Sequence, residues 1–123
     1  MAQLISVVDD DDSVRESLES LIRSVGLAAK VFASAEEFLR SAYLRKTDCL
    51  VLDVRMPGMS GIELHRHLMA SGSKVPVIFI TSHGCDDARS QALSDGAVAY
   101  LTKPFSQDEL LQAVRAGLKS NSS

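Results

Sequence analysis

The sequence of 123 residues lacks several features on which other classes of protein depend. It contains no tryptophan, only 5% aromatic residues and no apolar run near the ~20 residues that cross a bilayer, so we expect no membrane span. Cys49 and Cys85 are too few and too far apart for a disulfide framework, which indicates free thiols in a reducing cytoplasm. The segment Met1–Gln3 is not basic and carries no cleavage site, so no signal peptide is expected.

The sequence also lacks an excess of positive charge. Its formal net charge is −3 and its pI is about 5.5. An acidic surface repels phosphate backbones, so we expect that this chain does not bind nucleic acid by itself. With 46% hydrophobic and 24% charged residues, the composition is that of one globular domain. We place that domain at residues 1–119, followed by a polar segment at 120–123 that is a linker or the end of a cloned fragment.

What the sequence does contain is an alternation of short apolar runs and helical periods. The predicted strands are Leu4–Val8, Ala29–Phe32, Cys49–Asp53, Val77–Thr81 and Ala99–Thr102. The predicted helical stretches are Val14–Val25, Ala35–Ala42, Gly61–Leu68, Asp86–Ser94 and Gln107–Leu118. Five such units predict an α/β fold, in which a parallel sheet is covered by helices on both faces. The right-handed crossover rule restricts this fold to doubly wound strand orders.

The predicted helices differ in their caps and in their inward-facing residues. The first is expected to be capped by Asp12 or Ser13. The fourth offers the core only small or few apolar side chains, namely Ala88, Ala92 and Leu93.

Polar residues with useful chemistry follow four of the five predicted strands. The first strand ends in Asp9–Asp12, the third in Asp53, the fourth in Thr81 and the fifth in Lys103. The carboxyl ends of parallel strands share one edge of the sheet, so we expect these side chains to lie together. Clustered carboxylates repel one another and need a cation, and Mg²⁺ suits oxygen ligands. With Mg²⁺ and Lys103 nearby, Asp53 becomes a candidate nucleophile toward phosphorus, with Thr81 as a hydrogen-bond donor.

Each of these residues also has a purely structural interpretation when it is taken alone. The acidic run fits a solvated loop that caps a helix about as well as it fits a metal site. Thr81 fits an ordinary strand residue, and a lysine before a proline is a weak signal. Their joint placement at the strand ends favours the phosphoryl-transfer interpretation.

Four segments resemble the receiver domain of two-component response regulators. They are Val7–Arg15 (VVDDDDSVR), Leu50–Leu64 (LVLDVRMPGMSGIEL), Val77–Gly84 (VIFITSHG) and Gly96–Phe105 (GAVAYLTKPF). They occur in the family's order and span nearly the whole chain. Two of them, Leu50–Leu64 and Val77–Gly84, are most like the FixJ-type group. The resemblance implies that residues 1–119 are a receiver with a flavodoxin-like, doubly wound sheet of five parallel strands in the order 2-1-3-4-5, with five helices.

The resemblance also implies roles for the acidic residues. Asp53 matches the phosphorylated aspartate. Asp10 and Asp53 match direct ligands of Mg²⁺ (or Mn²⁺), and Arg55 matches the residue that offers its backbone carbonyl to the metal. Asp9 matches an indirect ligand that acts through water.

Further positions match the phosphoryl-binding and switch residues of the family. Thr81 and Lys103 match the pair that contacts the phosphoryl group. Thr81 and Tyr100 match the pair that changes position on phosphorylation. The bond between Lys103 and Pro104 matches a cis peptide, which X-Pro bonds adopt in only about one case in twenty. His65 matches a position where FixJ-type sequences often have leucine, so the resemblance implies that it is half-buried.

The resemblance implies a signalling switch and not an enzyme that turns over a small substrate. A sensor histidine kinase or a phosphotransfer protein is expected to phosphorylate Asp53, and the domain is expected to assist both its phosphorylation and its dephosphorylation. The modification is expected to change the surface of the fourth helix, fifth strand and fifth helix and to favour a homodimer. FixJ-type receivers usually precede a helix-turn-helix domain, so DNA binding and transcription regulation are expected of an attached effector domain.

Other interpretations are weaker or stay open. A haloacid dehalogenase-type phosphatase needs a second aspartate where this chain has Arg55, and four aspartates would repel the phosphate of a flavin. His83 and Cys85 are too few ligands for zinc. Water gating and surface filling are both open for Arg55 and His83. A degenerate or stand-alone receiver that acts as a protein-interaction module also remains an alternative.

Overall fold

The sheet has the predicted architecture. The computed structural model describes residues 2–82 and 86–121, with side chains described as far as Lys119. Its strands are β1 (Leu4–Val8), β2 (Ala28–Phe32), β3 (Cys49–Asp53), β4 (Val77–Thr81) and β5 (Ala99–Thr102). Every neighbouring pair is parallel, and the strand order is β2-β1-β3-β4-β5. The predicted flavodoxin-like, doubly wound sheet is therefore confirmed.

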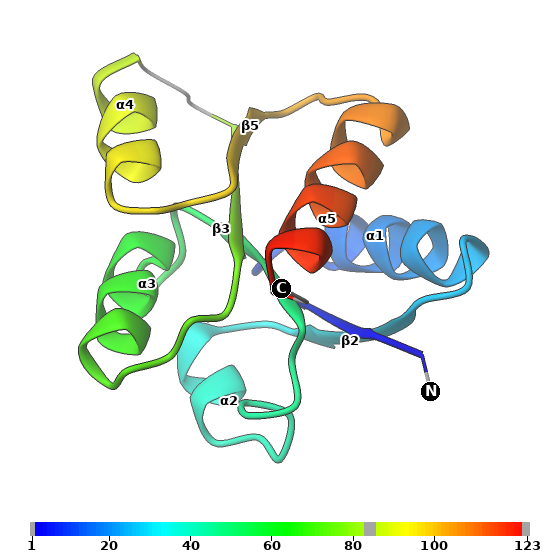
Figure 1. Ribbon diagram of the computed structural model, residues 1–123, viewed down its shortest axis with the longest axis horizontal. Helices are drawn as coiled ribbons and strands as arrows, with labels where there is room; N and C mark the ends of the chain where they lie inside the picture. The colour runs from blue at the N-terminus through cyan, green and yellow to red at the C-terminus, as the bar shows by residue number, and fades with distance from the viewer. Residues whose placement is uncertain (1, 83–85, 122–123) are drawn as a thin grey trace.

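Helices connect the strands and cover both faces of the sheet. They are α1 (Asp12–Ser24), α2 (Ala35–Leu39), α3 (Gly61–Ala70), α4 (Asp86–Ser94) and α5 (Gln107–Asn121). Helices α1 and α5 lie on one side of the sheet, and α2, α3 and α4 lie on the other (Figure 1). This layering follows from right-handed crossovers between parallel strands. None of the helices in residues 2–82 and 86–121 combines the length and the apolar character that a bilayer crossing requires.

The strands bury both of their faces, because the side chains of alternate residues pack in two separate hydrophobic cores. In β3, Cys49 and Val51 pack with residues of α1 and α5, whereas Leu50 and Leu52 pack with residues of α2, α3 and α4. All four side chains are fully buried. Burial on both faces explains why the strands appear in the sequence as continuous apolar runs.

Side-chain caps define where several of the helices begin. Asp11 caps α1, because its Oδ1 accepts from the backbone N–H of Ser13 at 2.9 Å. The prediction of a cap at Asp12 or Ser13 is wrong, since it is Asp11 that has the extended backbone a cap requires. Ser60 and Glu63 form a reciprocal capping box at the start of α3.

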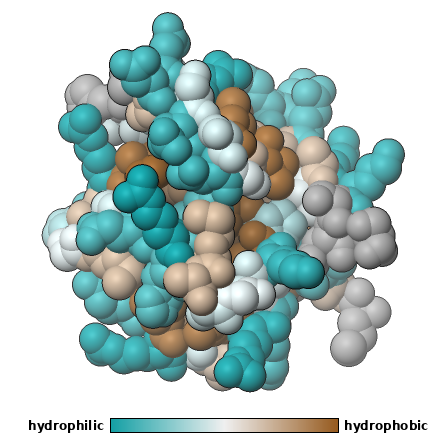
Figure 2. All heavy atoms as spheres, turned by 60° about the vertical axis from the view of Figure 1, so that its left-hand side comes forward, coloured by the Kyte–Doolittle hydropathy of each residue, from teal (hydrophilic) through white to brown (hydrophobic). Residues whose placement is uncertain are grey.

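Helix α4 is held to the sheet by little apolar surface. Ala92 is its one buried residue, and Ala88 is partly buried. The prediction that Leu93 faces the core is wrong, since this residue is 39% exposed. His65 of α3, expected to be half-buried, is only 6% exposed and packs edge-on against Phe79. Seen from the side on which α3 and α4 lie, the surface is mainly hydrophilic, with apolar side chains visible between polar ones (Figure 2).

Candidate functional site

The strand order brings four chain segments to one edge of the sheet. Strands β1, β3, β4 and β5 are successive neighbours in it. Asp53 and Thr81 are the last residues of β3 and β4, while Asp9 and Lys103 directly follow β1 and β5. Since parallel strands share one carboxyl edge, these four residues converge although they are far apart in the chain.

Three carboxylates meet at this edge. Asp9, Asp10 and Asp53 each place one oxygen within 4.8 Å of the other two. Asp9 is fully buried, Asp53 is 5% exposed and Asp10 is exposed. The cluster is therefore open to solvent on the side of Asp10.

Lys103 reaches this acidic cluster from the end of β5. Its Nζ donates a hydrogen bond to Asp9 Oδ2 at 2.9 Å and lies 4.0 Å from Asp53 Oδ2. Its backbone N–H donates to the carbonyl of Thr81 at 2.7 Å, and the bond between Lys103 and Pro104 is cis. One ammonium group thus faces two buried carboxylates.

The pKa of Asp53 is raised from its ordinary value of 3.8 to about 6. Burial is the main cause, because loss of solvent disfavours the charged form, and repulsion by Asp9 adds to it. Lys103 acts in the opposite direction, as does the backbone N–H of Arg55, which donates to Asp53 Oδ1 at 3.3 Å. A carboxyl group that titrates this close to neutrality is a frequent feature of functional sites.

The donor set fits a divalent cation. When Asp9, Asp10 and Asp53 are ionised, they outweigh the ammonium of Lys103 by two negative charges. All three offer oxygen ligands, which Mg²⁺ and Mn²⁺ prefer, and the exposed side of the cluster leaves room for water ligands. Burial raises the pKa of Asp53 most, and the repulsion between carboxylates that one cation does not balance adds to it.

The acidic loop after β1 is held in place from within the loop and from α1. The backbone N–H of Asp11 donates to Asp9 Oδ1 at 2.9 Å, and Arg15 Nη1 donates to the carbonyl of Asp9 at 2.7 Å. Arg15 also forms an ion pair with Asp12. Sequence reasoning missed this positioning role of Arg15, for which the only signal is its three-residue spacing from Asp12 on a helix.

Thr81 and Tyr100 lie next to the cluster and in the core, respectively. Both are buried. The Tyr100 ring packs in the core that α2, α3 and α4 cover, and its centroid is 6.3 Å from that of Phe79. By strand alternation, Thr81 is on the same side of β4 as Phe79. Thr81 and Tyr100 therefore lie on the face of the sheet that α2, α3 and α4 cover.

The remaining predicted residues contribute less to the geometry. The side chain of Arg55 is exposed, so its contact with the cluster is the backbone hydrogen bond to Asp53. Cys49 is a buried, free thiol. His83 and Cys85 lie outside the described residues, and the predictions made for them remain predictions.

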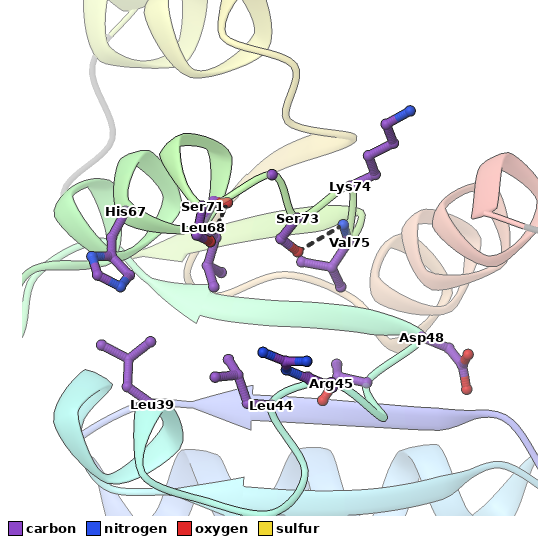
Figure 3. A pocket seen from close by; sticks show the side chains of 12 residues that line it. Leu39, Leu44, Arg45, Asp48, His67, Leu68, Ser71, Ser73, Lys74 and Val75 are labelled. Atoms are coloured by element: carbon purple, nitrogen blue, oxygen red, sulfur yellow. Dashed lines mark hydrogen bonds between the residues drawn. The ribbon is translucent and has the colours of Figure 1, made fainter.

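A separate cavity of about 630 Å³ lies at the opposite, amino edge of the strands (Figure 3). Leu39 and Leu44 face Leu68 and Val75 across it. The hydroxyl of Ser71 donates to the Leu68 carbonyl at 2.8 Å, so this polar group is engaged locally. The cavity contains none of the residues of the acidic cluster.

Comparison with known proteins agrees with this geometry. The chain matches the family model "Response regulator receiver domain" over residues 5–115. The response regulator protein TodT of Pseudomonas putida is 47% identical over 118 residues, which cover 96% of this chain and 52% of TodT. The transcriptional regulatory protein FixJ of Azorhizobium caulinodans is 45% identical over 114 residues, which cover 93% of this chain and 54% of FixJ. The chain thus spans about half the length of these curated relatives.

Solved structures show the same relationship. The response regulator StyR is 44% identical and superposes with a TM-score of 0.91, covering 99% of this chain and 62% of the StyR chain. The structure described as FixJ-N is 36% identical with a TM-score of 0.84, covering 97% of this chain and 95% of that one. Since the family model matches most of the chain and the relatives include FixJ, the chain belongs to the response regulator receiver domain family, in its FixJ-type group.

Proposed function

We propose that this receiver is a phosphoacceptor switch in which Asp53 takes up a phosphoryl group in a magnesium-dependent reaction. The observation that carries the proposal is the placement of Asp53. It is a nearly buried carboxylate beside Lys103 and two further aspartates, in a cluster that opens to solvent. Phosphoryl transfer requires a nucleophile with positive charge next to it, and this edge of the sheet offers both.

The transfer is a displacement at phosphorus. A carboxylate oxygen of Asp53 forms a bond to phosphorus while the P–N bond of a phosphohistidine breaks, and the imidazole leaves with that electron pair. The donor is a sensor histidine kinase or a phosphotransfer protein. Lys103 neutralises charge on the phosphoryl oxygens, and the hydroxyl of Thr81 donates a hydrogen bond to one of them.

Four residues would hold the metal ion. Asp10 and Asp53 would bind Mg²⁺ or Mn²⁺ directly, together with the backbone carbonyl of Arg55, and Asp9 would act through water. When bound, the ion supplies positive charge beside the transferring phosphoryl group. The same charges assist attack by water on the acyl phosphate, so the domain promotes its own dephosphorylation.

The output of the switch is a changed surface around α4. A phosphoryl group on Asp53 attracts Thr81 through a hydrogen bond. Thr81 then leaves a space behind it, which the ring of Tyr100 enters. We propose that the resulting face of α4, β5 and α5 forms a symmetric homodimer. Residues 1–119 would be the receiver and 120–123 part of a linker to an effector domain that binds DNA, as suggested by relatives that extend well beyond the matched region.

Intact-mass measurement after incubation with a small acyl phosphate and Mg²⁺ tests the acceptor. The wild type should gain one phosphoryl group, and Asp53→Asn should gain none, because an amide is a poor nucleophile. Asp108→Asn, at an exposed position in α5, is the matched control and should behave as the wild type. An Asp53→Asn variant that is modified at the normal rate contradicts the assignment. A wild type that takes up no phosphoryl group favours the alternative of a protein-interaction module.

A further inference from the structure

We propose that Glu36 is a positioning residue for the metal site, because its carboxylate holds the loop between β3 and α3 in place. This inference rests on the proposed function, since the same loop carries the Arg55 carbonyl that would bind the cation. Glu36 lies in the first turn of α2, on a different connection of the sheet from the acidic cluster.

The contact between Glu36 and the loop is direct. The backbone N–H of Met59 donates to Glu36 Oε2 at 3.3 Å, across 23 positions of sequence. Gly58 packs against the same carboxylate so closely that a Cβ there would lie 2.7 Å from Oε2, and its backbone has a φ of +76°. A left-handed glycine therefore lets the loop close onto the Glu36 side chain.

The other backbone hydrogen bonds of the loop are at its two ends, and between them the side chain of Met56 packs in the core. The N–H of Val54 donates to the carbonyl of Ile80 at 2.9 Å, and the N–H of Gly61 donates to the carbonyl of Val54 at 3.1 Å. Ser60 belongs to the capping box of α3. Among residues 2–82 and 86–121, Glu36 provides the one side-chain hydrogen bond that reaches the loop from outside residues 53–63.

Stability alone does not explain a glutamate at this position. Glu36 Oε1 is buried and has no hydrogen-bond partner among the described residues. Burying an acceptor without a partner opposes folding, so an apolar side chain would suit the packing better. The carboxylate is explained by its second oxygen, which accepts from the loop. Residues that hold a metal ligand in place typically affect metal affinity by tenfold or more when removed.

The test compares magnesium binding in four variants by calorimetric titration without a phosphoryl donor. Glu36→Ala removes the acceptor, and Glu36→Asp keeps the charge but shortens its reach. Both should raise the Kd for Mg²⁺ about tenfold. Glu36→Gln retains an acceptor oxygen and should stay within about twofold of the wild type. Glu37→Ala, at the exposed neighbouring position, is the matched control and should be unchanged.

Phosphorylation by a small acyl phosphate provides the second readout. The rate of Glu36→Ala should be low at limiting Mg²⁺ and should approach that of the wild type at saturating Mg²⁺. Because Mg²⁺ can also rescue an unstable fold, circular dichroism without Mg²⁺ is needed beside it and should show Glu36→Ala as folded as the wild type. Wild-type magnesium binding in both Glu36→Ala and Glu36→Asp, or equal weakening in Glu36→Gln, overturns the inference while leaving Asp53 as the acceptor. A wild-type chain that is phosphorylated on no residue and binds no Mg²⁺ overturns the proposed function, and the inference with it.

Discussion

At the scale of single residues, ionisation of the Asp53 carboxyl group destabilises the folded state. Its pKa of about 6 in the folded chain exceeds the value near 4 that the unfolded chain would have. The folded state therefore binds a proton more tightly than the unfolded state between about pH 4 and pH 6. This loss of stability is absent below about pH 4, develops as the pH rises through about 6 and is complete at neutral pH. The proposed function, which needs the charged carboxylate as nucleophile, is thus at the expense of stability.

We predict that Asp53→Asn stabilises the protein at neutral pH. The amide removes the buried charge, and its repulsion by Asp9, and should raise the free energy of unfolding by about 1–3 kcal/mol at pH 7. The gain should shrink as the pH falls toward 4, where the wild-type carboxyl group is protonated. Urea denaturation at several pH values in the absence of Mg²⁺ measures both effects. A gain that is the same at pH 4 and pH 7 would show that charge is not its source.

At the scale of elements, the start of α3 is packed directly onto the end of β3. A Cβ added to Gly61 would lie 2.1 Å from the carbonyl oxygen of Asp53. That oxygen belongs to the backbone, so neither partner can move away by changing a rotamer. The residue that begins α3 therefore helps to define where Asp53, the proposed phosphoacceptor, lies.

We predict that Gly61→Ala destabilises the protein by about 2–3 kcal/mol and slows phosphorylation of Asp53. Overpacking against rigid backbone outweighs the roughly 1 kcal/mol by which alanine favours a helix. Thermal melts and acyl-phosphate reactions measure the two effects. Gly72→Ala is the control, because it meets open space and suffers only from its φ of +87°, a cost of about 1 kcal/mol. Normal phosphorylation of Gly61→Ala would show that the end of β3 shifts without loss of function.

Helix α4 differs from its neighbours in how firmly it is held. It buries Ala92, whereas α3 buries Leu64, His65 and Leu68. At about 25 cal/mol per Å² of apolar surface, one alanine contributes little to holding a helix. Weakly held elements open first, and they are the ones available to a switch.

We predict that the backbone amides of α4 exchange with solvent faster than those of α3. Hydrogen exchange followed by mass spectrometry should show the contrast in the free protein. A beryllofluoride mimic of the phosphoryl group should change protection in α4 and β5 more than in α1. Equal protection of α3 and α4 would remove the basis for treating α4 as the moving element.

At the scale of the whole molecule, the acidic edge links metal binding to folding. A ligand that binds the folded state alone stabilises it by an amount that depends on its concentration relative to its Kd. The unfolded chain does not hold Asp9, Asp10 and Asp53 within reach of one ion. Magnesium binding should therefore contribute to global stability.

We predict that Mg²⁺ at ten times its Kd stabilises the wild type by about 1.4 kcal/mol, or about 5 °C in melting temperature. Asp10→Ala removes a proposed direct ligand at an exposed position and should respond much less. Scanning fluorimetry with and without Mg²⁺ measures the difference. Equal responses of the two proteins would argue against a metal site in the acidic cluster.

We also predict that the phosphorylated molecule self-associates. Sedimentation velocity should show a larger species when beryllofluoride and Mg²⁺ are present and the smaller one when they are absent. Leu93 is exposed on α4, so Leu93→Glu should weaken the association without affecting phosphorylation. A single species of the same size in all conditions would rule out dimerisation of this domain as its output.

The sequence by itself determined the order of strands and helices and the identity of the acidic edge. Continuous apolar runs such as Cys49–Asp53 indicate strands buried on both faces, because only those can dispense with polar residues. The strand ends could then be located, and a parallel sheet must bring such ends together. Asp9, Asp53 and Lys103 were therefore predictable as a group from chain position alone.

The tertiary structure decided what depends on contacts between distant segments. Glu36 and Met59 meet across two connections of the sheet, and nothing in the local pattern of either signals the other. Helical periodicity predicted the covered side of α4 correctly for Ala88 and Ala92 but wrongly for Leu93, which is exposed. The raised pKa of Asp53 arises from burial and from Asp9 on another strand. Local patterns are read along the chain, whereas these properties are set by which segments the fold places side by side.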